Sequence, residues 1–141
     1  MEVFTEEWAR ACCEALNRSE AYRASAATWE GAIVLAMSAD GAQGVEADRA
    51  VYIDAHQGAC RGARVATEEE GTNAPFVFRA DAATWQRLLA GQVDPVGAVM
   101  QGKLRLVRGN LLTLAKYAQA AKDMVTAAAT VGGTFDGNGS A

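Results

Sequence analysis

The sequence predicts an α+β domain in which a mostly antiparallel sheet is covered by helices on one side. Apolar residues follow helical spacing near both ends of the chain and alternate in the middle, which indicates helices flanking strands. Glycine-containing turns separate neighbouring alternating segments, as in strands joined by hairpins. The chain has 141 residues, half of them hydrophobic, which suits one domain with its own core.

The N-terminal segment predicts two helices. Thr5 is a favourable N-cap, and Glu6 and Glu7 follow it at the positive end of the helix dipole. Two apolar stripes at helical spacing come next: Trp8, Cys12 and Leu16, then Tyr22, Ala26 and Trp29. Gly31 is expected to end the second helix.

Five segments predict strands. In the first, Ile33, Leu35 and Met37 share one face, and smaller apolar residues lie on the other. The expected strands are residues 33–37, 50–56, 60–66, 75–79 and 103–107. Segment 68–74, EEEGTNA, predicts a polar loop.

The C-terminal half predicts three helices, over residues 81–91, 95–102 and 111–130. Asp81 and Asp94 are suitable caps, and Pro95 fits a first helical position. We expect one domain over residues 1–130. Residues 131–141 are polar and rich in glycine, so they predict a flexible tail.

Composition narrows the classes of function. A formal net charge of −4 argues against a nucleic-acid partner. No apolar segment approaches the roughly 20 residues that span a bilayer, and the acidic start does not resemble a secretory signal. Three cysteines, two of them adjacent, do not predict a disulfide framework. We therefore expect a reduced, cytoplasmic protein.

Few residues suggest catalysis. His56 is the only histidine, and it precedes Cys60 by four residues, so the pair is a candidate for zinc binding or for a nucleophile and its base. A structural zinc site needs about four ligands, and only Cys12 and Cys13 remain to complete it. The alternative is a surface histidine. The glycines form no phosphate-binding loop. We expect no enzyme, catalytic residue, metal or cofactor.

One long stretch resembles a known family. It contains TWQRLLAG at residues 84–91, DPVGAVMQGKLRL at 94–106 and GNLLTLAK at 109–116. These ordered positions are similar to the sterol-binding domain of sterol carrier protein type 2 (SCP2). Upstream, WEGAIVL at 29–35 and AVYID at 50–54 match its first two strands more loosely.

The resemblance implies a five-stranded sheet covered on one face by about five helices, with a hydrophobic tunnel between them. Members bind sterols, fatty acids, fatty acyl-CoA or other lipids without transforming them. The implied ligand-binding residues are Trp85, Leu88, Leu89, Val96, Val99, Met100, Leu104, Leu106, Leu111 and Leu114. The alternative is an accessory domain with a filled core that acts through a partner chain. Whether the chain forms a homodimer is left open.

The chain departs from the family pattern after the last strand. Val107 and Arg108 both stand before Gly109, where the family has one residue. A bulge can absorb the extra residue. The extra residue also affects whether Leu111 and Leu112 point into the tunnel.

Basic residues lie on and beside this last strand. Lys103, Arg105 and Arg108 are suited to a carboxylate or phosphate head group at the tunnel mouth. The alternative is a basic edge that discourages strand pairing.

Overall fold

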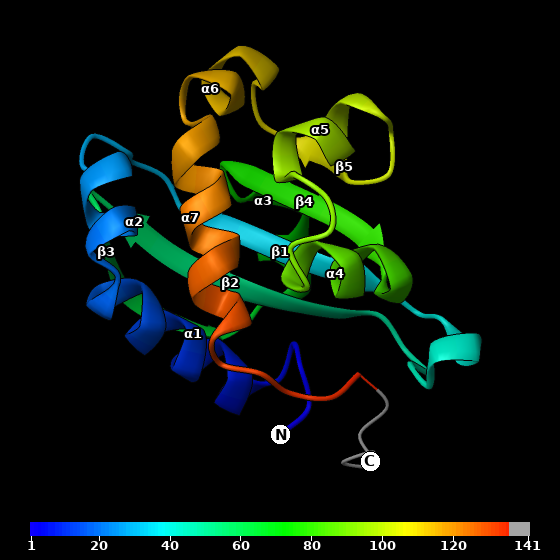
Figure 1. Ribbon diagram of the computed structural model, residues 1–141. Coiled ribbons are helices and arrows are strands. Elements are labelled where there is room, and N and C mark those ends of the chain that lie inside the picture. Colours follow the sequence, from blue (N-terminus) through cyan, green and yellow to red (C-terminus); the bar gives the residue numbers. More distant parts are fainter. Residues whose placement is uncertain (136–141) are drawn as a thin grey trace.

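The computed structural model describes residues 1–135, and it shows an α+β fold built on one five-stranded sheet (Figure 1). The strands are β1 (Ile33–Ser38), β2 (Arg49–His56), β3 (Ala59–Val65), β4 (Phe76–Asp81) and β5 (Arg105–Arg108), in the spatial order β3-β2-β1-β4-β5. The helices are α1 (Glu6–Arg18), α2 (Glu20–Ser25), α3 (Glu68–Asn73), α4 (Ala82–Leu89), α5 (Pro95–Met100), α6 (Leu111–Lys116) and α7 (Ala118–Ala129), with a short 3₁₀ helix over Gly41–Gln43.

The sheet is mostly antiparallel, which confirms the predicted fold class. Only β1 and β4 run parallel, with Ile33 opposite Phe76. The other neighbours are antiparallel. Gln57 and Gly58 both have positive φ, at 50° and 83°, so they form the tight turn that joins β2 to β3.

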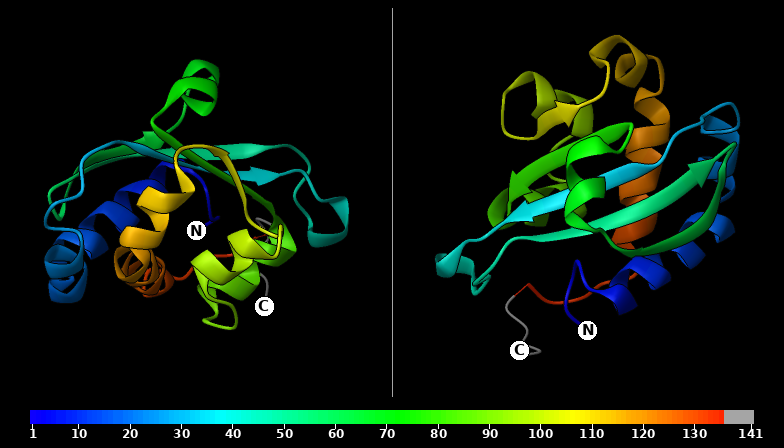
Figure 2. Two further views of the ribbon diagram at one scale, coloured as in Figure 1. Left: turned by 90° about the horizontal axis from the view of Figure 1, so that it is seen from above. Right: turned by 180° about the vertical axis from the view of Figure 1, so that it is seen from behind.

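Helices cover both faces of the sheet, although unequally. Figure 2 shows α3 alone on one face and the other helices on the opposite face. The predicted polar loop at 68–74 is therefore wrong over most of its length. Thr67 and Glu70 form a reciprocal capping box, which stabilises a first turn of three glutamates. Beneath α3, Val34 and Val77 form a small second core.

The remaining predicted helix starts are confirmed. The side chains of Thr5, Asp81 and Asp94 each accept a hydrogen bond from a backbone N–H three residues later. The first strand is buried on both faces: Ile33 lies in the main core and Val34 in the second.

The last strand contains the predicted bulge. Phe78 lies opposite Leu106, and Val77 lies opposite Arg108, so Val107 is the extra residue. The chain then turns at Gly109, whose φ is 129°. A Cβ at this position would lie 2.4 Å from the Phe76 ring, so the turn requires glycine.

The predicted helix over 111–130 is two helices, because Tyr117 interrupts it. Its hydroxyl lies 2.8 Å from Thr28 Oγ1 and donates to the Thr28 carbonyl at 3.0 Å. Its ring packs edge-on against Trp29, with centroids 4.9 Å apart. These long-range contacts hold the residue outside helical geometry, which local sequence pattern does not encode.

The two ends of the described chain lie together. The Val3 N–H donates to the Thr134 carbonyl at 2.9 Å, and the Thr134 N–H donates to the Met1 carbonyl at 2.8 Å. Part of the segment predicted as a flexible tail therefore pairs with the N-terminus. Residues 136–141 lie outside the described residues.

Cys13 and Cys60 form a disulfide, contrary to the expectation of unpaired cysteines. The bond joins α1 to the edge strand β3 across 47 positions of sequence, a proximity that only folding creates. Asn17 supports the same junction, since its amide bonds both the Cys60 N–H and the Cys60 carbonyl at 2.9 Å.

Reducing this disulfide should lower the free energy of unfolding by about 2–4 kcal/mol, because the open chain regains the entropy of a long loop. Urea denaturation with and without dithiothreitol measures the loss. A Cys13→Ser/Cys60→Ser variant is the control, since reductant should leave its stability unchanged. Equal stability of the wild type under both conditions would contradict the expectation.

Candidate functional site: an apolar cavity

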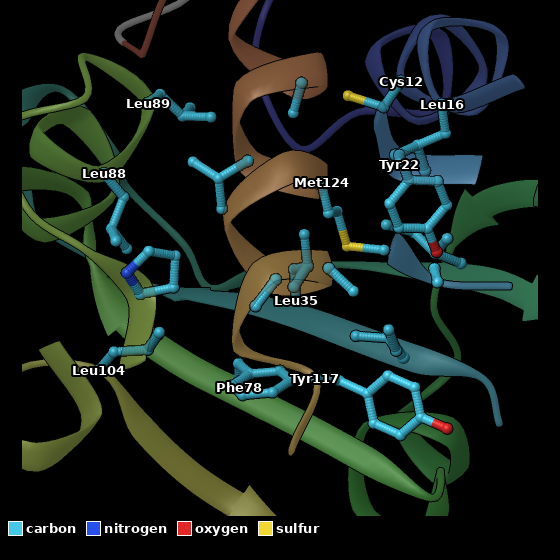
Figure 3. Close-up of a pocket in the computed structure, with 18 of the residues that line it drawn as sticks. Cys12, Leu16, Tyr22, Leu35, Phe78, Leu88, Leu89, Leu104, Tyr117 and Met124 are labelled. Atoms are coloured by element: carbon cyan, nitrogen blue, oxygen red, sulfur yellow. The ribbon is translucent and has the colours of Figure 1, made fainter. Parts of the chain in front are cut away.

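An apolar cavity of about 80 Å³ lies between the sheet and the larger helical layer (Figure 3). Side chains from both layers line it, including Cys12 and Leu16 of α1, Leu35 of β1, Phe78 of β4 and Met124 of α7. None of the lining residues carries a charge. The cavity is thus a non-polar compartment between the two layers.

The cavity exists because α7 faces the sheet largely with small side chains. Ala120, Ala121 and Ala128 all line it from this helix. An alanine side chain ends at Cβ, so the helix covers the sheet without filling the space above Leu35 and Phe78. Larger residues on α7 would close the gap.

Several wall residues remain partly accessible. Leu35 lies on the central strand β1, yet it is only half-buried, whereas Ile53 on the neighbouring strand is almost fully buried. Leu89, Tyr117 and Val125 also line the cavity and are half-buried. These side chains have room to move, so this part of the wall is less tightly packed than the rest of the core.

Polar groups on the wall fall into two kinds. The indole N–H groups of Trp29 and Trp85 donate to the Gly31 and Ala36 carbonyls, at 2.8 and 2.9 Å. Within residues 1–135, the buried Trp8 indole N–H has no hydrogen-bond partner. The Tyr22 hydroxyl also makes no hydrogen bond within that range, and burial raises its pKa to about 12. The wall thus contains two polar groups without hydrogen-bond partners, the Trp8 indole N–H of α1 and the Tyr22 hydroxyl of α2.

Five of the ten predicted ligand-binding residues line the cavity. They are Trp85, Leu88, Leu89, Leu104 and Leu114. The other five do not: Val96, Val99 and Leu106 are half-buried outside the wall, and Met100 and Leu111 are exposed.

On α5, the face that is buried differs from the stripe that the sequence pattern predicted. The helix has six residues, and it buries Pro95 and Ala98 instead of the larger stripe through Val96 and Met100. Lys103 and Leu104 donate backbone N–H groups to the Ala98 carbonyl, at 2.9 and 3.1 Å, which fixes that face inward. Met100 is left 69% exposed.

The bulge and the glycine turn precede α6, whose first two leucines lie outside the cavity wall. Leu111 and Leu112 are 42% and 81% exposed, and only Leu114 of this helix is buried. Lys103, Arg105 and Arg108 are also exposed and lie outside the cavity wall.

Sequence reasoning missed the N-terminal side of the site. Trp8, Cys12, Leu16 and Tyr22 all line the cavity. The helical spacing of these residues predicted that they are buried, but not that they line a cavity. Met124 of α7 also lines the cavity.

The alternative sites do not assemble in the described structure. Cys60 is bonded to Cys13, and His56 lies half-buried on β2. Within residues 1–135, no three His, Cys, Asp or Glu side chains cluster where they could hold a metal. No helix in that range is both long and apolar enough to span a bilayer.

The chain matches the profile of the SCP-2 sterol transfer family over residues 13–122. It is similar to a crystal structure of sterol carrier protein 2, with 47% identity and a TM-score of 0.84 over 93% of this chain and 100% of that one. The chain is also similar to a solution structure from Thermus thermophilus, which is of a conserved hypothetical protein described as possibly a sterol carrier protein. The two chains share 47% identity, with a TM-score of 0.83 over 94% of this chain and 92% of that one.

Apo sterol carrier protein 2 from Yarrowia lipolytica shares the fold at 16% identity, with a TM-score of 0.58 over 84% of this chain and 86% of that one. No curated protein matches the chain.

Cys12 tests the character of the wall, because it is a free, buried thiol. Burial raises its pKa from an ordinary value of 9.0 to about 12. At about pH 8, this shift reduces the reactive thiolate about a thousandfold. Iodoacetamide should therefore label the oxidised native protein far more slowly than the urea-unfolded protein, as mass spectrometry can measure. A Cys12→Ser variant should take no label, and equal rates in both states would contradict burial of the Cys12 thiol.

Proposed function

Because the chain belongs to the SCP-2 sterol transfer family, we propose that it binds and carries a hydrophobic lipid, without catalysis, in the cavity between the sheet and the helices. The family supports lipid binding or transfer in general. The observation that carries the proposal is the cavity wall, in which no residue carries a charge. Such a wall suits a sterol, a fatty acid, the chain of a fatty acyl-CoA or another lipid.

The driving force for binding is burial of apolar surface. Each methylene transferred from water contributes about 0.8 kcal/mol. An apolar wall separates ligands that differ by one methylene only weakly, so we expect a modest preference among lipids.

The cavity must widen to hold a whole lipid, because about 80 Å³ is below the several hundred Å³ of typical ligand sites. The half-buried Leu35, Leu89 and Val125 are suited to this adjustment, and Met124 is a flexible wall residue. The short helix α6 buries only Leu114, so displacing it disrupts little packing. We therefore expect an elongated tunnel in the bound state.

The unused polar groups favour a lipid with one polar end. The Trp8 N–H can donate a hydrogen bond, and the Tyr22 hydroxyl can donate or accept one. Both residues lie on the α1–α2 side of the cavity. A ligand hydroxyl or carboxyl beside Trp8 would satisfy a buried donor that otherwise lacks a partner.

The small cavity supports a second candidate, an accessory domain whose largely filled core acts through a partner chain. The two candidates differ in what co-purifies with the protein. The carrier should release lipid on chloroform extraction, in near-stoichiometric amount by mass spectrometry. If no lipid is recovered and none binds on addition, the accessory domain is favoured.

An Ala121→Trp variant tests the site itself. Ala121 lines the cavity, and an indole there occupies space that the lipid needs. We expect the affinity for a fluorescent fatty acid to fall at least about tenfold, the loss from blocking burial of two or more methylenes. Titration followed by fluorescence measures the affinity, and circular dichroism checks the fold.

Ala129→Trp is the matched control. It makes the same change on the same helix, at an exposed position outside the cavity wall. Its affinity should equal that of the wild type. Equal affinities in both folded variants would move the binding site away from this cavity.

A further inference from the structure

Positive charge is concentrated in one part of the chain. Residues 95–122 contain five basic residues, among them all three lysines of the protein, and no acidic residue. The rest of the chain holds the other eight basic residues and all 17 acidic residues, a formal charge of −9. The overall acidity therefore hides a cationic segment.

This segment forms one end of the molecule. Figures 1 and 2 show α5, β5 and α6 together at that end. β5 is also an edge strand of the sheet. We define the basic end by four residues, Lys103, Arg105, Arg108 and Lys116, which are all exposed.

The charges of the basic end form no ion pair in the described structure, and the Lys116 ammonium lies 5.7 Å from the centroid of the Tyr117 ring. The six ion pairs among residues 1–135 all use arginines outside residues 95–122. Within the described residues, no acidic side chain lies within ion-pair distance of the basic end. Its positive potential is thus not neutralised locally.

Exposed apolar side chains accompany these charges. Four of the six large hydrophobic residues that are exposed in the described structure come from this end. They are Met100, Val107, Leu111 and Leu112. Leu112 is 81% exposed. Protection of an edge strand explains Arg105 and Arg108, but it does not explain leucines placed in water beside them.

We propose that this end docks on a bilayer that contains anionic lipids. The cations bind phosphate head groups, and the leucines insert at the boundary between head groups and acyl chains. The acidic remainder of the molecule is repelled from the same surface, which orients the basic end toward it.

Docking here would also bring the cavity to the membrane. Leu104 lies between two residues of this end in sequence, and Leu114 lies between Leu112 and Lys116. Both leucines line the cavity. The inference goes beyond the proposed function, because docking can be measured on vesicles without any cargo.

Vesicle flotation tests the proposal. The wild type should float with equimolar phosphatidylcholine and phosphatidylglycerol, and much less with phosphatidylcholine alone. Binding should fall steeply at about 0.5 M salt, since screening weakens interactions between exposed charges. Lys103→Glu/Arg108→Glu should reduce the partition coefficient at least about tenfold, and Leu111→Ser/Leu112→Ser should cause a loss of about tenfold or more.

Control variants on other surfaces of the protein separate the effect of the basic end from the effect of net charge or of losing any exposed apolar residue. Arg18→Glu/Arg23→Glu makes the same change in net charge at exposed positions of α1 and α2, and Val65→Ser removes an exposed apolar residue from β3. Both controls should bind as the wild type does. Equal losses in control and test variants, or equal binding to both kinds of vesicle, would overturn the proposal.

Light scattering without vesicles tests the remaining alternative, which is that this surface forms a dimer. A dimer that Leu111→Ser/Leu112→Ser dissociates, together with no flotation of the wild type, would assign this surface to self-association and overturn membrane docking. Loss of flotation with fatty-acid affinity unchanged would support docking and leave the proposed function standing. Loss of fatty-acid affinity in Ala121→Trp with unchanged flotation would likewise separate the two functions.

Discussion

The position of α7 over the sheet is the constraint on which the interior depends. This helix crosses the sheet and faces it with Ala120, Ala121 and Ala128. The helix packs against α1, α2, α4 and α5, but its alanines cannot fill the space above Leu35 and Phe78. The same packing therefore supplies both the stability of the layer and the empty volume inside it.

Other features of the fold stabilise the layers around this gap. The Cys13–Cys60 disulfide and the Asn17 amide attach α1 to the sheet edge on one side. On the opposite edge, β5 contains a bulge and α6 is fixed mainly by Leu114. The molecule thus has a cross-linked side and a more weakly packed side. The weakly packed side also carries the concentrated positive charge, on which the proposed membrane docking rests.

The sequence predicted elements more reliably than faces. Asp81, Asp94 and Gly91 mark helix ends by local chemistry, and each holds in the structure. The prediction failed on α5 because six residues carry too little periodicity to decide between a stripe through Met100 and one through Ala98. It failed at segment 68–74 because a polar composition predicts a loop, whereas the capping box between Thr67 and Glu70 stabilises a helix there.

By itself, the sequence determined the order of the strands along the chain, most of the helices, the caps at Thr5, Asp81 and Asp94, and the family, because these depend on neighbours in the chain. Only the tertiary structure decided which apolar faces enclose empty space and that Cys13 meets Cys60. It also placed the exposed leucines beside the basic residues. Side-chain spacing specifies a face of each element, but what lies opposite that face depends on how distant segments pack.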